Sequence, residues 1–215
     1  MNNIYIIRHG ESEGNIKKGK TQRGYIIDTE IELTENGKMQ SKSAGDCLNH
    51  IISRDSMIAF WVSPFKRTRQ TFAEIEKRIT NKNFEYFEDP RLVEQDFGDF
   101  DFQFYEKWKE ISPHSYYINQ ARYNTPSGRF FARLENGENM LDVYNRMSLF
   151  VTTRLERTNY ADNVIITHGN ASRALVMFLL NQKIEEYYES DVPKNASIRH
   201  IVRYDTRYVD KGYIN

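Results

Sequence analysis

The stretch Ile4-Tyr5-Ile6-Ile7-Arg8-His9-Gly10-Glu11 joins a short apolar run directly to a charged segment that contains a glycine. The run is too short for a buried helix, and its apolar residues do not alternate with polar ones. This pattern is typical of a strand that is covered on both faces, as in a parallel sheet. Two further runs of the same kind, Met57 to Val62 and Val164 to Thr167, predict two more strands.

Helical segments are predicted between and after these runs. They cover residues 35–52, 65–79, 139–158 and 171–180. Thr34 resembles an N-cap for the first, and Pro64 is well placed for the first turn of the second. Residues 197–203 are predicted to form a closing strand. Because strands alternate with helices, the expected fold is α/β, a three-layer αβα sandwich with a mostly parallel sheet.

The middle of the chain, residues 90–134, fits neither a helical nor a strand period. A segment of this length inside a compact domain is more often functional than idle. We expect an irregular cap over the site, inserted in a single domain that spans residues 1–215. Its aromatic side chains are expected to pack the cap onto the sheet, or alternatively to form an apolar wall for the leaving group. They are Phe97, Phe100, Phe102, Phe104, Tyr105 and Trp108.

Composition and charge bear on the class of partner. Lys plus Arg and Asp plus Glu both number 30, so the formal net charge of zero does not suggest a nucleic-acid or membrane partner. The first residues do not resemble a signal peptide, and no run reaches membrane-spanning length, so we expect a cytoplasmic protein. The single cysteine, Cys47, allows no internal disulfide, and no pattern indicates an oligomeric state. A basic cluster is interpreted as a solvated loop, with a rim for anionic substrates as the alternative: Lys17, Lys18, Lys20 and Arg23.

Histidine and arginine follow the predicted strands at the point where each strand ends. The first strand ends in Arg8-His9, the second in a segment that contains Arg67, and the third in His168-Gly169-Asn170. The carboxyl ends of parallel strands form the ligand crevice of an open α/β sheet. Two histidines and two arginines should therefore converge there, and the same geometry favours Arg67 over Arg69.

This set of side chains suits the transfer of a phosphoryl group. The planar fork of arginine donates two parallel hydrogen bonds to phosphate and keeps its charge. Two guanidinium groups oppose protonation of a neighbouring imidazole, and a neutral imidazole has a lone pair that can act as a nucleophile. The leaving group needs a proton, for which a carboxyl group is the natural donor. Glu94 lies among apolar residues that would desolvate it, and Asp96 is its rival.

A metal site is the chemical alternative for the same residues. His9, His168 and Glu94 are residue types that bind zinc or iron. Two nearby arginines would repel a dication, so we expect neither a metal nor another cofactor.

The order of these motifs resembles that of the histidine phosphatase superfamily, which has the phosphoglycerate mutase-like fold. Arg8-His9-Gly10-Glu11-Ser12 followed by Asn15 resembles the family signature, and Leu33-Thr34 with Gly37 resembles the stretch after it. The segments at residues 63–67, 94–98, 137–139 and 168–170 resemble later motifs in family order. The likeness extends over most of the chain.

The resemblance implies a role for each matched residue. His9 would carry the phosphoryl group, and Glu94 would act first as an acid and then as a base toward water. No metal would take part. The predicted catalytic residues are therefore His9, Glu94 and His168, and the predicted phosphate-binding residues are Arg8, Arg67, Asn15 and Asn170.

Two departures from the family pattern favour hydrolysis over a mutase reaction. The mutases have a basic-aromatic run after the donor glutamate, whereas Gln95-Asp96-Phe97-Gly98 stands here. The segment between Glu94 and Gly137 is also shorter than a mutase is expected to have. The expected function is that of a histidine acid-type phosphatase, a metal-independent hydrolase that acts on a small phosphorylated substrate through a phosphohistidine. A cofactor-dependent phosphomutase and a non-catalytic phosphate-binding protein are the alternatives.

Overall fold

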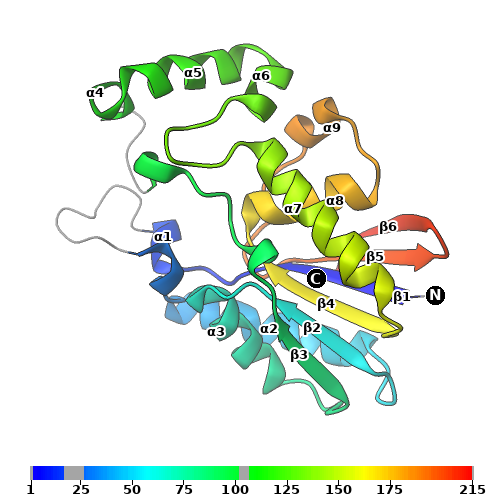
Figure 1. The fold of residues 1–215 in the computed structure, drawn as a ribbon. Helices are drawn as coiled ribbons and strands as arrows, with labels where there is room; N and C mark the ends of the chain where they lie inside the picture. Colours follow the sequence, from blue (N-terminus) through cyan, green and yellow to red (C-terminus); the bar gives the residue numbers. More distant parts are fainter. Residues whose placement is uncertain (1, 17–26, 102–106, 215) are drawn as a thin grey trace.

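A computed structural model describes residues 2–16, 27–101 and 107–214 and contains a six-stranded sheet in the order β3-β2-β4-β1-β5-β6 (Figure 1). The strands are β1 (Asn2–Arg8), β2 (Ile58–Val62), β3 (Phe84–Glu88), β4 (Asp162–Thr167), β5 (Ile198–Tyr204) and β6 (Arg207–Ile214). β1 to β4 are mutually parallel, whereas β5 runs antiparallel to β1 and β6 antiparallel to β5. The mostly parallel α/β fold that the sequence predicts is thereby confirmed.

The two strands that the sequence did not predict, β3 and β6, lie at the two edges of the sheet. Their residues are mostly exposed or half-buried, in contrast to the fully buried β2 and β4. An edge strand tolerates charged residues, so neither segment has the continuous apolar run that marked the central strands. The predicted closing strand is β5.

Two separate apolar layers cover the sheet. They explain why apolar residues do not alternate with polar ones in the central strands. Ile4 and Ile6 of β1 pack with α7 (Met140–Thr153) and α8 (Gly169–Leu179) on one face. Tyr5 and Ile7 pack with α2 (Glu35–Ile51) and α3 (Lys66–Glu76) on the other. Figure 1 shows these helix pairs on opposite sides of the sheet. Successive strand residues point to opposite faces, so a sheet covered twice needs apolar residues at both.

The ends of these helices follow local capping chemistry. The Thr34 hydroxyl accepts a hydrogen bond from the Gly37 amide, as the partial capping pattern predicted. Asn139 and Asp142 form a reciprocal capping box at the start of α7. The prediction for Pro64 is wrong, because α3 begins at Lys66 with Phe65 as its N-cap. The predicted helix at 139–158 ends earlier, at Thr153, and a 3-10 turn covers Leu155–Arg157.

The cap segment, residues 90–134, contains more regular structure than the sequence predicted. It holds η2 (Pro90–Leu92), η3 (Gly98–Phe100), α4 (Trp108–Ile111), α5 (Pro113–Asn124) and α6 (Pro126–Phe131). The expectation of an irregular cap is therefore wrong. Ser112 and Thr125 cap α5 and α6, and each is followed by a proline in the first turn, where the missing N–H costs nothing. These Ser-Pro and Thr-Pro pairs were the features of the sequence that indicated the starts of α5 and α6, although α5 itself lacks a clear apolar stripe.

Two of the described cap aromatics, Phe100 and Trp108, pack against each other. Phe100 is buried, and its ring centroid lies 4.7 Å from that of Trp108. This contact supports the role of these two rings in packing the cap. Phe102, Phe104 and Tyr105 lie outside the described residues, as does the basic loop from Lys17 to Arg23. The remaining elements are α1 (Glu13–Ile16), η1 (Asp28–Glu30) and α9 (Ile184–Glu189).

Candidate active site

The carboxyl ends of β1 and β4 place His9 and His168 next to each other. The two strands are adjacent and parallel, and Arg8 pairs in register with Thr167. The imidazole centroids lie 5.2 Å apart, and both side chains are buried. The structure thus brings together two residues that are 159 positions apart in the sequence, as the strand-end argument predicted.

Hydrogen bonds fix both the tautomer of His9 and the loop that carries it. Its Nδ1 lies 2.7 Å from the Gly10 carbonyl oxygen, which can only accept, so Nδ1 holds the proton and Nε2 keeps its lone pair. Asn195 donates to the His9 carbonyl from its side-chain amide. A Cβ on Gly10 would lie 2.3 Å from the carbonyl oxygen of Gly37, so only glycine permits this approach to α2.

His168 is oriented by Ser63, at the end of the neighbouring strand β2. The Ser63 Oγ lies 2.8 Å from His168 Nε2. The other ring nitrogen, Nδ1, is buried and has no hydrogen-bond partner among the described residues. Phe65 contacts the His168 ring edge-on, with centroids 5.1 Å apart. Ser63 was part of a quoted motif but was assigned no role, because only the fold shows that it faces the second histidine.

Both imidazoles are kept uncharged by their surroundings. Burial is the main cause that lowers the pKa of His9 well below its usual value, and Arg67 and Arg8 lower it further. Burial also lowers the pKa of His168, followed by the charges of Arg67 and of nearby groups. A neutral His9 whose Nε2 keeps its lone pair has the form that a nucleophile requires.

The protein should become less stable as the pH is lowered, because of these two histidines. The unfolded chain binds a proton at each histidine below a pH of about 6.5, whereas the native state resists it, so the unfolded state gains protons as pH falls. The free energy of unfolding should therefore decrease by up to about 1.4 kcal/mol per pH unit for each histidine. Urea unfolding between pH 7.5 and 5.5 measures this slope. The His9→Asn variant should show a shallower slope, and an unchanged slope would contradict the assignment.

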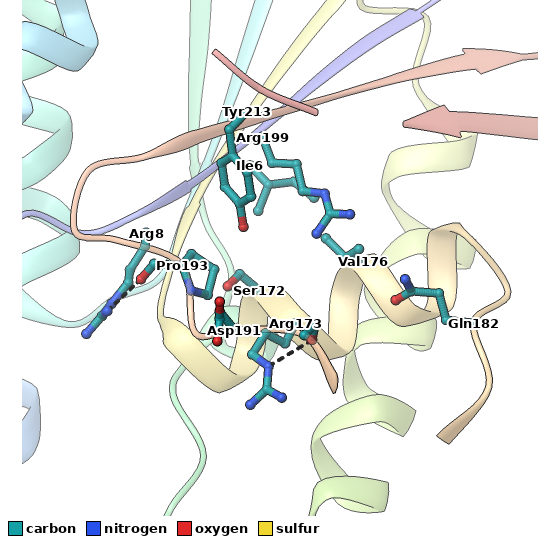
Figure 2. Close-up of a pocket in the computed structure, with 11 residues that line it drawn as sticks. Ile6, Arg8, Ser172, Arg173, Val176, Gln182, Asp191, Pro193, Arg199 and Tyr213 are labelled. Carbon is teal, nitrogen blue, oxygen red and sulfur yellow. Dashed lines mark hydrogen bonds between the residues drawn. The ribbon is translucent and has the colours of Figure 1, made fainter. Parts of the chain in front are cut away.

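Arg8 reaches the site from β1 and is held on one side by the loop before β5. Its Nη1 donates to the Pro193 carbonyl at 2.7 Å, as Figure 2 shows. Its Nε is buried and has no hydrogen-bond partner among the described residues. Burial is the main cause that lowers the pKa of Arg8. The Arg8 Nε–H is thus a buried, charged donor without a partner in the described part of the chain. A bound anion would supply the hydrogen bond that this group lacks.

A pocket beside Arg8 opens between α8 and β5 (Figure 2). Of the predicted site residues that the structure describes, only Arg8 lines it. The other lining side chains include Arg173, Arg199 and Tyr213. The pocket is thus a neighbour of the histidine pair rather than its entrance.

Arg67 lies at the start of α3 and is buried, with 5 % of its surface exposed. Its guanidinium makes a two-pronged ion pair with Asp28, with Nη1–Oδ1 at 2.9 Å and Nη2–Oδ2 at 3.1 Å. Its carbon CZ lies 4.9 Å from the centre of the Phe65 ring. Phe65 therefore lies between Arg67 and the His168 ring, and the charge of Arg67 lowers the pKa of both His9 and His168.

Asn15, in α1, turns its carbonyl oxygen inward. Its Oδ1 accepts from the Ser12 amide at 3.0 Å and from Asn195 Nδ2 at 3.1 Å. This arrangement leaves the Nδ2 group of Asn15 as the donor that a phosphate oxygen could accept from. Asn195 therefore joins Asn15 to the backbone of His9. Sequence reasoning assigned Asn195 no part in the site, because no pattern connects residue 195 to residue 9.

Glu94 lies at the amino end of α8. Its Oε1 accepts hydrogen bonds from the backbone amides of Gln95, Asn170 and Ala171, at 3.0 to 3.1 Å. Its Oε2 has only a longer contact of 3.2 Å, with the Asn170 amide. A helix amino terminus attracts a carboxylate in this way. The sequence did not indicate these backbone amides as partners, and desolvation of Glu94 by apolar neighbours stays a prediction.

Glu94 Oε2 nevertheless faces the same space as Arg8. A Cβ placed on Gly169 would lie 3.4 Å from Glu94 Oε2 and 3.8 Å from Arg8 Nε. Asp96, the rival acid, is exposed and accepts from the Gly98 amide in a turn. Glu94 therefore lies close to Arg8, the predicted phosphate-binding arginine, whereas Asp96 lies in an exposed turn.

Arg146 of α7 holds the segment that carries Glu94. Its guanidinium donates to the carbonyl oxygens of Arg91, Val93 and Glu94, at 2.6 to 3.0 Å. It also pairs with Glu138 at 2.9 Å. Sequence reasoning did not single out Arg146, since an arginine in an amphipathic helix normally indicates a solvated face.

Asn170 contributes mainly to the surroundings of Glu94. Its backbone amide donates to the Glu94 carboxylate, and its side-chain Nδ2 donates to Gln95 Oε1 at 3.1 Å. These contacts favour a role in holding Glu94. Phosphate binding by the Asn170 side chain stays a prediction.

Asp101, from the cap, adds a carboxyl group with unusual proton affinity. Burial, followed by the charges of Asp28 and Asp96, raises its pKa to about 7.

Within residues 2–16, 27–101 and 107–214, no three His, Cys, Asp or Glu side chains gather as metal ligands. None of the described helices combines the length and the apolarity that crossing a bilayer requires.

Comparison with known families gives a match over nearly the whole chain. The family model described as histidine phosphatase superfamily (branch 1) matches residues 4–213. The Arabidopsis thaliana phosphoglycerate mutase-like protein AT74 is 30% identical over 212 residues, which is 91% of this chain and 63% of that protein. The chain therefore spans less than two thirds of this relative's length.

Two other proteins show the range of activities among similar chains. The broad-range acid phosphatase DET1 of Saccharomyces cerevisiae is 25% identical over 91% of this chain and 83% of its own length. The crystal structure of the alpha-ribazole phosphatase from Shigella flexneri superposes with a TM-score of 0.77. It is 18% identical and covers 98% of this chain and 95% of its own, so it shows a shared fold.

Proposed function

This chain belongs to the histidine phosphatase superfamily, and we propose that it hydrolyses phosphomonoesters through a phosphohistidine formed on His9. The observation that carries the proposal is the state of His9. It is buried and uncharged, its Nδ1 is tied to the Gly10 carbonyl, and the charges of Arg67 and Arg8 help to keep its pKa low. Phosphatases among its relatives, such as the acid phosphatase DET1, support the same reaction class.

In the proposed first step, His9 Nε2 attacks phosphorus in line with the leaving oxygen. The N–P bond forms as the P–O bond to the leaving group breaks, and Glu94 gives its proton to the leaving oxygen. Arg8, Arg67 and His168 bind the equatorial oxygens of the phosphoryl group, assisted by Asn15. Fixed positive charge stabilises the transition state because it costs no reorganisation.

In the second step, water replaces the leaving group. Glu94, now a carboxylate, takes a proton from the water, whose oxygen attacks phosphorus as the N–P bond breaks. The products are inorganic phosphate and the original neutral His9. We assign the proton to Oε2 of Glu94, because Oε1 already accepts three backbone amides.

Hydrolysis is favoured over a mutase reaction by the charge around the site. A mutase must hold a second phosphate and exclude water. Asp28 places a carboxylate against Arg67, and Asp96 stands where the mutases have a basic-aromatic run. The phosphomutase is the second candidate, favoured by the mutase-like relative AT74.

A panel of phosphomonoesters assayed with a chelator present tests the proposal. Wild-type activity should survive chelation, and a radiolabelled, acid-labile phosphoenzyme should accumulate on rapid quenching. Isomerisation of phosphoglycerate, measured with and without a bisphosphorylated activator, should be much slower than hydrolysis. Activity that requires a metal ion would overturn the mechanism. Phosphate binding without turnover of any ester would favour the non-catalytic alternative.

A further inference from the structure

We propose that Asp28 is a positioning residue, which holds the guanidinium of Arg67 so that one edge of it faces the phosphoryl group. The inference rests on the proposed function, in which Arg67 binds phosphate. It adds a residue from η1, a segment that no sequence motif connected with the site. Its basis is the pattern of hydrogen bonds that Arg67 makes and leaves open.

The contact between the two residues uses a defined set of donors. Arg67 Nη1 donates to the Asp28 carbonyl oxygen at 2.7 Å and to its Oδ1 at 2.9 Å. Nη2 donates to Oδ2 at 3.1 Å. The carboxylate therefore occupies the outer end of the guanidinium, between its two terminal nitrogens.

The remaining donors lie on one edge of Arg67. A guanidinium has five N–H groups in a planar fork, and three of them are used by Asp28. The two that remain, on Nε and Nη2, are parallel neighbours that donate to no acceptor among the described residues. Such an edge donates two parallel hydrogen bonds to a carboxylate or a phosphate. Asp28 thus leaves open the geometry that a phosphoryl group requires.

Further contacts fix the segment of Asp28 to the same helix as Arg67. Gln70 Oε1, on that helix, accepts a hydrogen bond from the Leu33 amide at 2.7 Å. The exposed ion pair between Lys66 and Glu32 adds little to this anchor. Leu33 is buried. A carboxylate anchored in this way is a fixed partner for Arg67.

The opposite interpretation, in which Asp28 competes with substrate, predicts effects of the opposite sign. A competing carboxylate would be displaced by phosphate, and its removal would tighten the binding of anions. Removal of its negative charge would also raise the positive potential at the site. A positioning carboxylate predicts weaker binding and slower turnover after the same change, because Arg67 loses its fixed orientation.

The test compares Asp28→Asn with Glu32→Gln, a matched control that removes one carboxylate from the same segment without touching Arg67. Steady-state kinetics give kcat and KM. Inhibition by vanadate, an analogue of the phosphoryl group in the transition state, gives Ki. Asp28→Asn should lower kcat/KM and weaken vanadate inhibition by about 10- to 100-fold, the usual cost of a misplaced binding group. Glu32→Gln should stay within about twofold of wild type.

Two further variants separate positioning from general damage. Asp28→Glu keeps the charge but shifts the carboxylate by one methylene, and it should weaken vanadate binding in the same direction while leaving the Tm close to that of wild type. In an Arg67→Lys background, Asp28→Asn should have little additional effect, because an ammonium has no edge to orient.

Tighter vanadate binding in Asp28→Asn, or the same Ki as in Glu32→Gln, would overturn the positioning role. A fully additive loss in the Arg67→Lys background would overturn it as well. Failure of the proposed function is distinguishable, because the wild-type protein itself would then neither bind vanadate nor turn over an ester.

Discussion

Replacement of His9 by asparagine should lower kcat for phosphomonoester hydrolysis by about 10⁴-fold or more, equivalent to about 5 kcal/mol of transition-state stabilisation. Asparagine preserves a neutral, hydrogen-bonding side chain in a place that is 3 % exposed. It removes the one ring nitrogen that can bond to phosphorus. The rate should fall so far because both chemical steps pass through the N–P bond.

The same variant should still bind phosphate, because Arg8, Arg67 and His168 remain. KM for substrate and Ki for inorganic phosphate should therefore change far less than kcat. Incorporation of radiolabelled phosphate into protein should disappear. His50→Asn is the matched control, since His50 is exposed and far along α2 from the site. A His9→Asn enzyme that keeps a tenth of the wild-type kcat would exclude the phosphohistidine.

The predicted cluster followed from a rule that depends on few details. Adjacent parallel strands share an edge at which they end, so residues just after β1 and β4 must be neighbours whatever the loops do. His9 and His168 met this condition. Ser63, directly after β2, met it as well, although no role had been assigned to it. Asn195 and Asp28 did not, because their positions depend on the precise course of loops.

Glu94 shows that the partners of a residue are not given by its sequence neighbours. Its environment was inferred from the apolar residues beside it in the chain. Its actual partners are the amides at the start of α8, about 75 residues away, and the segment is held by Arg146. The cap helices were missed for a related reason, because short helices packed onto a domain need no strong apolar stripe of their own.

Glu94→Gln should produce a different kinetic signature from loss of His9. Glutamine fits the site, because its carbonyl oxygen can replace Oε1 in accepting the three backbone amides, with its NH₂ group at the Oε2 position. It can neither donate an acidic proton nor accept one from water. Loss of general acid-base catalysis costs about 10² to 10⁴ in rate for each step that needs it.

The two steps can be separated by the choice of leaving group. A nitrophenolate leaves without protonation, so transfer of its phosphoryl group to His9 should stay fast in Glu94→Gln, while hydrolysis of the phosphoenzyme becomes slow. Stopped-flow absorbance should then show a burst of one nitrophenol per enzyme, followed by slow turnover. An alkyl phosphate needs the proton in the first step, and it should show no burst.

Asp96→Asn is the control for this experiment and also tests the rival acid. Asp96 is exposed, and asparagine retains the oxygen that accepts from the Gly98 amide, so the turn should persist. Its kinetics with both substrates should match those of wild type. A burst in Asp96→Asn together with wild-type kinetics in Glu94→Gln would transfer the acid-base role to Asp96. That result would require the cap to move Asp96 toward Arg8 in the substrate complex, since it is Glu94 Oε2 that shares the space beside Gly169 with Arg8.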